Sequence, residues 1–154
     1  MGPDHVTIRE ATASDLAPIA ALLEHAGLGA EDVLVPGTRY WVAEGSSGEL
    51  IGAIGAEYGV SALLLRSMAV LRAARGHALG AALVEYALAA ARSAGYRVAY
   101  LFSTDAGPYW ERRGFREVPV PELVAALPDA PQVRHYDRIG WLPTEVAWRR
   151  DLDL

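Results

Sequence analysis

One segment of the chain joins an apolar stretch to a helical stretch through a short loop that contains Gly76 and Gly80. Residues 62–71 are almost entirely apolar, which is typical of a strand buried on both faces of a sheet. Residues 81–92 carry apolar residues at helical spacing. The first turn of a helix leaves its N–H groups without partners, and these groups together with the helix dipole favour an anion. The segment therefore predicts a strand–loop–helix unit that binds a phosphate or pyrophosphate group.

The loop does not match the common nucleotide-binding fingerprints. The chain has no lysine, which excludes the phosphate-binding loop GxxxxGK[ST], and it contains no GxGxxG segment. Six loop residues taken alone would also fit an ordinary strand-to-helix turn. The interpretation therefore depends on the rest of the chain.

Composition narrows the class of protein. With 154 residues, 52% of them apolar, the chain is expected to form one domain, residues 1–154, with its own core. The net charge of −5 argues against nucleic-acid or membrane partners, and the absence of cysteine excludes disulfides and thiol catalysis. No metal is predicted. Residues 1–5 lack the apolar core of a signal peptide, and no apolar run reaches the about 20 residues that span a bilayer, so we expect a cytoplasmic protein.

The spacing of apolar residues predicts a mixed α/β sheet of six to seven strands flanked by about four helices. Strands are expected at residues 6–9, 40–44, 49–58, 62–71, 97–103, 115–118 and 144–151. Helices are expected between Thr12 and Gly27, at 81–92 and at 106–113. The prolines of segment 119–140 predict mostly loop around a short helix at about 121–127.

Two segments of the chain resemble motifs of the GNAT superfamily of N-acetyltransferases. Arg75, Ala78 and Gly80 resemble its acetyl-CoA pyrophosphate loop, Gln/Arg-x-x-Gly-x-Gly/Ala. Residues 103–115 resemble its Asn-x-x-Ala-x-x-x-Tyr-x-x-x-Gly-Phe segment. The resemblance covers residues 6–118 and implies a GNAT-like fold. Ala78 replaces the middle glycine of the loop, a change that is tolerated at helical dihedral angles and costly where φ is positive.

A narrower resemblance points to one branch of this superfamily. Residues 57–59, 62–70 and 141–143 are similar to the arsenic-resistance N-acetyltransferases. That branch usually carries Cys-Pro near the last strand, where this chain has Leu142-Pro143. The similarity implies an amino-acid-like substrate, with an arsenic- or phosphorus-containing analogue among the candidates.

The resemblance implies acetyl-CoA as co-substrate and indicates which residues bind it. In GNAT proteins the pantetheine arm pairs with the central strand like an added strand, which implies main-chain contacts from Met68, Ala69 and Val70. The pyrophosphate contacts would come from Arg75, Gly76, His77, Ala78, Leu79 and Gly80. Ser103 and Trp110 would also contact the cofactor, Trp110 by packing over the pantetheine. The alternative for these residues is an ordinary core and a solvated helix start.

N-acetyl transfer also needs a base for the amine and a proton for the leaving thiolate. Glu57, near the end of strand 49–58, is the candidate base, and a solvated glutamate at a strand end is the alternative. Trp110 stands at the usual Tyr position, so the candidate acid is the neighbouring Tyr109; water, or departure of the thiolate unaided, is the alternative. Arg66 lies in an otherwise apolar strand and needs a partner, either Glu57 or a carboxylate of the substrate.

The residues and the resemblance together predict direct transfer of an acetyl group from acetyl-CoA to the primary amine of a small, amino-acid-like substrate. A non-catalytic acyl-CoA-binding regulatory module and a protein N-acetyltransferase are the alternatives. Segment 119–140 and an exposed edge of the last strand would suit a homodimer contact.

Overall fold

The computed structural model describes residues 6–28, 37–74 and 78–152. The contacts between residues divide the chain into two compact units. The first consists of Met1–Ala56 and Ser67–Ala87, and the second of Glu57–Arg66 and Leu88–Leu154. The expectation of one domain over residues 1–154 stays a prediction.

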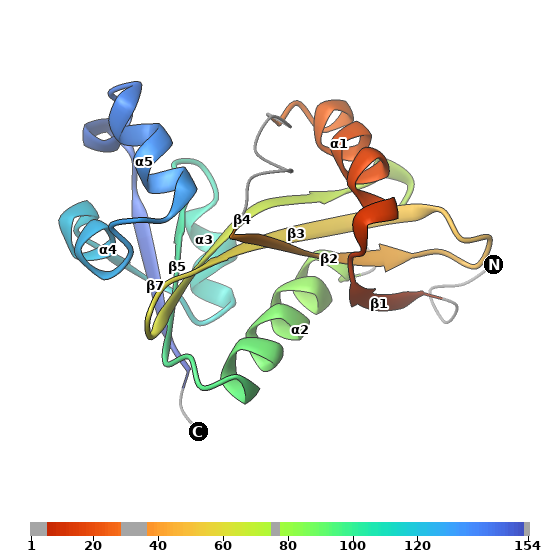
Figure 1. Cartoon of the computed structure of the whole chain (residues 1–154), viewed down its shortest axis with the longest axis horizontal. Helices are drawn as coiled ribbons and strands as arrows, with labels where there is room; N and C mark the ends of the chain where they lie inside the picture. The colour runs from red at the N-terminus through yellow and green to blue at the C-terminus, as the bar shows by residue number, and fades with distance from the viewer. Residues whose placement is uncertain (1–5, 29–36, 75–77, 153–154) are drawn as a thin grey trace. The chain divides into compact units, whose positions relative to one another are not determined.

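The described residues form a mixed α/β fold with seven strands in one hydrogen-bonded order, β1-β2-β3-β4-β5-β7-β6 (Figure 1). The strands are β1 Thr7–Glu10, β2 Thr38–Glu44, β3 Leu50–Tyr58, β4 Ala62–Val70, β5 Val98–Phe102, β6 Arg116–Val118 and β7 Ala147–Asp151. The α-helices are α1 Leu16–His25, α2 Leu79–Ser93, α3 Gly107–Arg112, α4 Val120–Ala126 and α5 Pro131–Arg138. Strands β4 and β5 are parallel, whereas β5 and β7 are antiparallel, so the predicted mixed sheet is confirmed. In these ranges no helix is long and apolar enough to cross a membrane.

In the first unit, α1 and the beginning of α2 cover opposite faces of the strands (Figure 1). Successive side chains of a strand point to opposite faces, and β2 shows this directly. Tyr40 and Val42 pack in one cluster with Ile19 of α1. Trp41 instead contacts Tyr86 of α2, with the ring centroids 5.6 Å apart. The strands of this unit are therefore covered on both faces.

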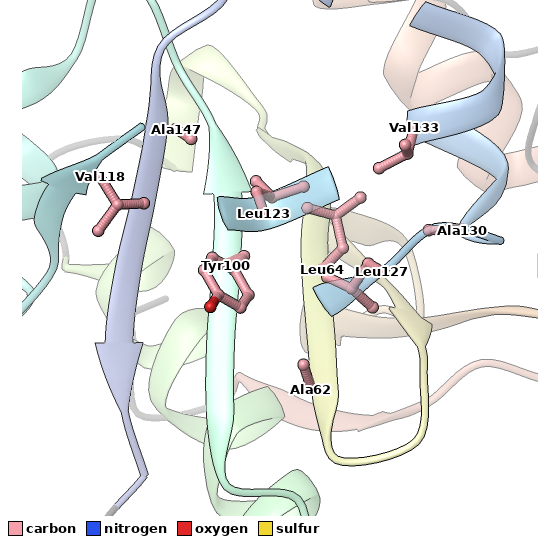
Figure 2. Close-up of a cluster of buried hydrophobic side chains, with 9 residues drawn as sticks. All are labelled: Ala62, Leu64, Tyr100, Val118, Leu123, Leu127, Ala130, Val133 and Ala147. Atoms are coloured by element: carbon pink, nitrogen blue, oxygen red, sulfur yellow. The ribbon is translucent and has the colours of Figure 1, made fainter. Parts of the chain in front are cut away.

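In the second unit, α4 and α5 pack on one face of the strands (Figure 2). The buried cluster between them consists of Ala62, Leu64, Tyr100, Val118, Leu123, Leu127, Ala130, Val133 and Ala147. Leu123 of α4 lies between Tyr100 and Leu64 in Figure 2 and is fully buried. Beside this cluster Arg149 Nη1 lies 2.8 Å from Glu122 Oε2 and holds the pKa of that carboxyl below its ordinary value. Both apolar packing and an ion pair therefore attach α4 to the strands.

The segment 119–140 contains two helices, whereas the sequence predicts one short helix within a loop. The expected helix is present as α4, but α5 was missed. Pro131 occupies the first position of α5. A proline there costs no helical hydrogen bond, because the first N–H groups of a helix have no partner within it. This proline begins a helix instead of preventing one.

The expectation that the last strand has an exposed edge is wrong. Strand β7 is hydrogen-bonded to β5 on one side and to β6 on the other. The pairing with β6 covers Ala147–Arg149, opposite Arg116–Val118. The edge of β7 is covered because the short strand β6, which precedes α4 in the chain, lies outside it in the sheet. The homodimer stays a prediction, without this edge to support it.

Candidate functional site

The backbone of strand β4 departs from regular strand geometry near its end. Ser67 has a φ of +54°, which is uncommon for a residue other than glycine and marks a bulge when it occurs in a strand. The parallel pairing of β4 with β5 covers Ala62–Leu65 and ends two residues before Ser67. Met68, Ala69 and Val70 follow the bulge and belong to the first unit. The strand therefore changes its backbone geometry at the start of the segment for which main-chain cofactor contacts are predicted.

The side chains of this segment differ in burial. Ala69 is 4% exposed and belongs to the core cluster formed with α1. Met68 and Val70 are half-buried. A cofactor contact from Ala69 would therefore be made by its backbone, as the resemblance implies.

The start of α2 carries the described part of the predicted pyrophosphate loop. Three predicted loop residues lie outside the described part of the chain, namely Arg75, Gly76 and His77. Leu79 begins α2 and is buried, and Gly80 follows in the first turn. The N–H of Ala82 donates to the carbonyl oxygen of Ala78 at 3.0 Å, so helical hydrogen bonding starts from Ala78. The N–H groups at such a start have no partner within the helix and suit an anion.

The sequence leaves open whether Ala78 has helical dihedral angles or a positive φ, and the structure shows the positive φ, which is the costly alternative. Its φ is +57°, and its side chain is exposed. The left-handed region places the Cβ of an L-residue too close to the backbone, at a cost of about 1–2 kcal/mol. Glycine, which the family pattern has at this position, carries no such cost.

Replacing Ala78 with glycine is therefore expected to raise the free energy of unfolding by about 0.5–1 kcal/mol. The relief of strain exceeds the added backbone entropy of the unfolded chain, which is about 0.5–1 kcal/mol. Urea unfolding with an unchanged slope would measure the gain. The matched control is Ala89→Gly at an exposed position inside α2, which is expected to destabilise by about 1 kcal/mol. Equal losses at both positions would contradict the role of the positive φ.

A buried ion pair lies in the second unit. Glu57, in β3, has no exposed surface, and the side chain of Arg66, in β4, is 6% exposed. Arg66 Nη1 donates to Glu57 Oε2 at 2.7 Å. The backbone N–H of Gln132, in the first turn of α5, donates to Glu57 Oε1 at 2.9 Å. The helix dipole also favours an anion there. Of the two partners that the sequence allows for Arg66, the structure shows Glu57.

This geometry sets a condition on the role of Glu57 as general base, which stays a prediction. A base must come within hydrogen-bonding distance of the proton that it removes. Both oxygens of Glu57 already accept hydrogen bonds, one from Arg66 and one from Gln132. To lose its proton to Glu57, the amine, or a water between the amine and Glu57, would have to form a second hydrogen bond to one of these oxygens.

The candidate acid, Tyr109, lies in α3. Its hydroxyl oxygen is buried and has no hydrogen-bond partner in the described ranges. Burial raises the pKa of this hydroxyl, and the charges of Arg113 and Arg112 offset part of that rise. The hydroxyl therefore keeps its proton at neutral pH, as a group that protonates a thiolate must.

The two other predicted cofactor contacts of the second unit are tied into its structure. Trp110 is 8% exposed, and its ring lies 5.5 Å from that of Phe115 between centroids. The N–H of Ser103 donates to Val146 O, and its carbonyl oxygen accepts a hydrogen bond from Trp148 Nε1, both at 2.9 Å. A cofactor contact from Ser103 would therefore use its hydroxyl group. The packing of Trp110 over the pantetheine stays a prediction.

Two polar residues of α5 are not predicted from the sequence. Gln132 Nε2 donates to the hydroxyl oxygen of Tyr136 at 3.2 Å. The two side chains are four residues apart and so lie on one face of the helix. They went unnoticed because α5 itself was missed. The i, i+4 spacing behind a proline at the first helical position is the signal that would have found them.

Comparisons with known proteins agree with this fold. A family model described as an acetyltransferase (GNAT) domain matches residues 36–117. A GNAT-family acetyltransferase from Staphylococcus aureus Mu50 has a TM-score of 0.75 at 17% identity, over 96% of this chain and 99% of that one. N-acetylglutamate synthase from Neisseria gonorrhoeae, complexed with coenzyme A and N-acetyl-glutamate, has a TM-score of 0.76 at 22% identity. The match covers 97% of this chain and 35% of the synthase.

A third similar structure is an aminoglycoside 6'-N-acetyltransferase complexed with coenzyme A. Its TM-score is 0.67 at 18% identity, over 96% of this chain and 98% of that one. A comparison with curated proteins finds no match. The narrower resemblance to the arsenic-resistance branch stays a prediction.

The family model covers more than half of the sequence, and its match includes β4, the start of α2 and α3. The chain therefore belongs to the GNAT family of acetyltransferases.

Proposed function

We propose that this protein transfers an acetyl group from acetyl-CoA directly to the primary amine of a small, amino-acid-like molecule. The observation that carries the proposal is the positive φ of Ser67, which stands directly before Met68–Val70 in β4. In GNAT proteins the pantetheine arm pairs with this part of the central strand. The start of α2, with Leu79 and Gly80 in its first turn, supports a pyrophosphate contact of the same cofactor.

In the proposed reaction the amine nitrogen attacks the thioester carbonyl carbon. A C–N bond forms, the C–S bond breaks, and coenzyme A leaves as its thiolate. The amine loses one proton and the thiolate gains one, so the products are the amide and the free thiol. The backbone N–H of Met68 or Ala69 would stabilise the negative charge that develops on the carbonyl oxygen. Tyr109 would donate the proton to the sulfur, because its raised pKa keeps the hydroxyl protonated until the thiolate forms.

The predicted substrate contact of Arg66 requires the acidic group of the substrate to share the guanidinium with Glu57. For comparison, Arg39 pairs with Glu10 in the first unit, with Arg39 Nη2 2.6 Å from Glu10 Oε2. Both side chains of that pair are largely exposed, at 54% and 41%. Of these two ion pairs, only the one between Arg66 and Glu57 is buried, and burial holds its two side chains in one arrangement.

The first test is titration of the purified protein with acetyl-CoA, followed by thiol release with a panel of amino acids and their phosphinic and arsenical analogues. Binding with amine-dependent thiol release is the expected result. Tyr109→Phe is expected to lower kcat about a hundredfold with little change in the Kd for acetyl-CoA, because a general acid acts on the chemical step. Tyr86→Phe, at a tyrosine that is 44% exposed, is the control.

Absence of acetyl-CoA binding would overturn the proposal. Binding without thiol release on the whole panel would favour the regulatory acyl-CoA-binding module instead. Glu57→Gln keeps the acceptor for the Gln132 N–H and removes the charge, so it tests the base. A fall in kcat that a higher pH restores would support that role, because the amine then arrives deprotonated.

A further inference from the structure

Three aromatic rings follow one another in the second unit, from the end of β5 through α5 to the residues after it. The ring centroids of Phe102 and Tyr136 lie 5.4 Å apart, and those of Tyr136 and Trp141 lie 5.3 Å apart. Phe102 and Tyr136 are half-buried, whereas Trp141 is 50% exposed. This aromatic row, Phe102–Tyr136–Trp141, therefore ends at the surface. The exposed part of the Trp141 ring is apolar surface that a bound ligand would cover.

The helical turn before Tyr136 adds a polar group to the row. Gln132 is 8% exposed, and its Nε2 donates to the Tyr136 hydroxyl oxygen at 3.2 Å. The amide oxygen of Gln132, Oε1, is buried and has no hydrogen-bond partner within residues 6–28, 37–74 and 78–152. Buried acceptors without a donor are rare because they have lost their hydrogen bonds to water. This oxygen is therefore an acceptor that the described residues leave without a donor.

The two observations specify one kind of molecule. The Gln132 oxygen calls for an N–H or O–H donor, and the aromatic row calls for a ring or another large apolar group. The proposed reaction brings a primary amine, which is such a donor. We propose that Gln132 and the aromatic row bind the acceptor amine, and that this amine carries an aromatic or large apolar substituent, as an aromatic amino acid does. The inference rests on the proposed function for its identification of the bound amine as the acetyl acceptor.

Binding requires a small rearrangement. Because Oε1 of Gln132 is covered by neighbouring atoms, the donor reaches it only when the covering side chains rotate. The backbone N–H of Gln132 keeps its bond to Glu57 during such a rotation, because it belongs to the main chain of α5. The amide group can therefore move without breaking the contact that holds the first turn of the helix.

The tryptophans of the chain allow a direct binding measurement. The chain has four of them. Trp41, Trp110 and Trp148 are 7%, 8% and 6% exposed, whereas Trp141 is 50% exposed. Acrylamide therefore quenches mainly the fluorescence of Trp141, and a ligand that covers the aromatic row reduces the quenching.

The experiment compares three probes without acetyl-CoA in the sample. L-phenylalanine carries both the amine and the ring, L-alanine lacks the ring, and 3-phenylpropionate lacks the amine. L-phenylalanine is expected to protect Trp141 at concentrations about tenfold lower than either of the others, because each of them loses one of the two contacts. Equal protection by L-alanine, or no protection by L-phenylalanine, would overturn the proposal.

Two variants separate a binding role from a structural one. Gln132→Met removes the amide and keeps the backbone bond to Glu57, so it is expected to weaken L-phenylalanine about tenfold and leave 3-phenylpropionate unchanged. Tyr136→Leu is expected to weaken both ring-bearing probes, while Tyr86→Leu, the same change at an exposed tyrosine, weakens neither. Unchanged binding of L-phenylalanine to folded Gln132→Met, with folding checked by thermal unfolding, would overturn the assignment of its oxygen.

Protection of Trp141 and release of thiol are separate results, so they test the binding site and the proposed function separately. Protection by L-phenylalanine without thiol release after acetyl-CoA is added would support the binding site and overturn its assignment to the acetyl acceptor. Thiol release with other amines, without protection by L-phenylalanine, would overturn the site and leave the transferase intact.

Discussion

Replacing Arg66 with methionine is expected to lower the free energy of unfolding by about 3–5 kcal/mol, the cost of leaving a buried charge without its partner. Methionine fills much of the same volume but cannot neutralise Glu57, whose carboxylate has no exposed surface. The remaining hydrogen bond from the Gln132 N–H does not replace the lost charge. The shift of the urea midpoint at unchanged slope measures the loss.

A second variant and a control test the cause of this loss. Combining Arg66→Met with Glu57→Gln is expected to restore more than half of the lost stability, because no unpaired charge then remains and the Gln132 N–H keeps an acceptor. Arg39→Met breaks the exposed pair with Glu10 and is expected to cost less than about 1 kcal/mol. An Arg66→Met loss as small as that of Arg39→Met would show that burial does not make the pair important.

Replacing Leu123 with alanine is expected to destabilise the protein by about 3–5 kcal/mol. Leu123 is fully buried at the centre of the cluster that joins α4 to the strands (Figure 2). The change removes buried apolar atoms and leaves a cavity beside Leu64 and Tyr100, and both effects reduce stability. Thermal and urea unfolding measure the loss.

The control for this cavity is Val60→Ala. Val60 is 100% exposed in the turn between β3 and β4, so its truncation is expected to change stability by less than about 0.5 kcal/mol. A loss of less than about 1 kcal/mol for Leu123→Ala would mean that the packing of α4 contributes little to the stability of the second unit.

Local patterns predicted most of the elements that carry the candidate site. The apolar run of β4 and the helical spacing of α2 are properties of neighbouring residues, so they can be read directly from the chain. The same patterns do not predict α5, because prolines usually interrupt a helix, whereas Pro131 occupies the first helical turn, where proline is tolerated. The contact between Gln132 and Tyr136 lies within this helix and is therefore not predicted either.

The conformation of Ala78 shows where the pattern stops being informative. The sequence indicates that alanine replaces a family glycine there, and it leaves two conformations open. Only the fold decides between them, because alanine can adopt both conformations, at different cost, and the identity of the residue does not say which one is present.

The sequence by itself determined the family and the mixed sheet, because these depend on periodicity and on short motifs. The tertiary structure alone decided that β7 is an inner strand and that Glu57 accepts a hydrogen bond from Gln132, 75 positions away. The sequence also offered Glu57 as a partner for Arg66, and the fold shows this pairing, while the contact of Arg66 with a substrate stays a prediction. The physical reason is that a buried carboxylate must be satisfied by whichever donors the folded chain brings to it, and those donors come from distant segments.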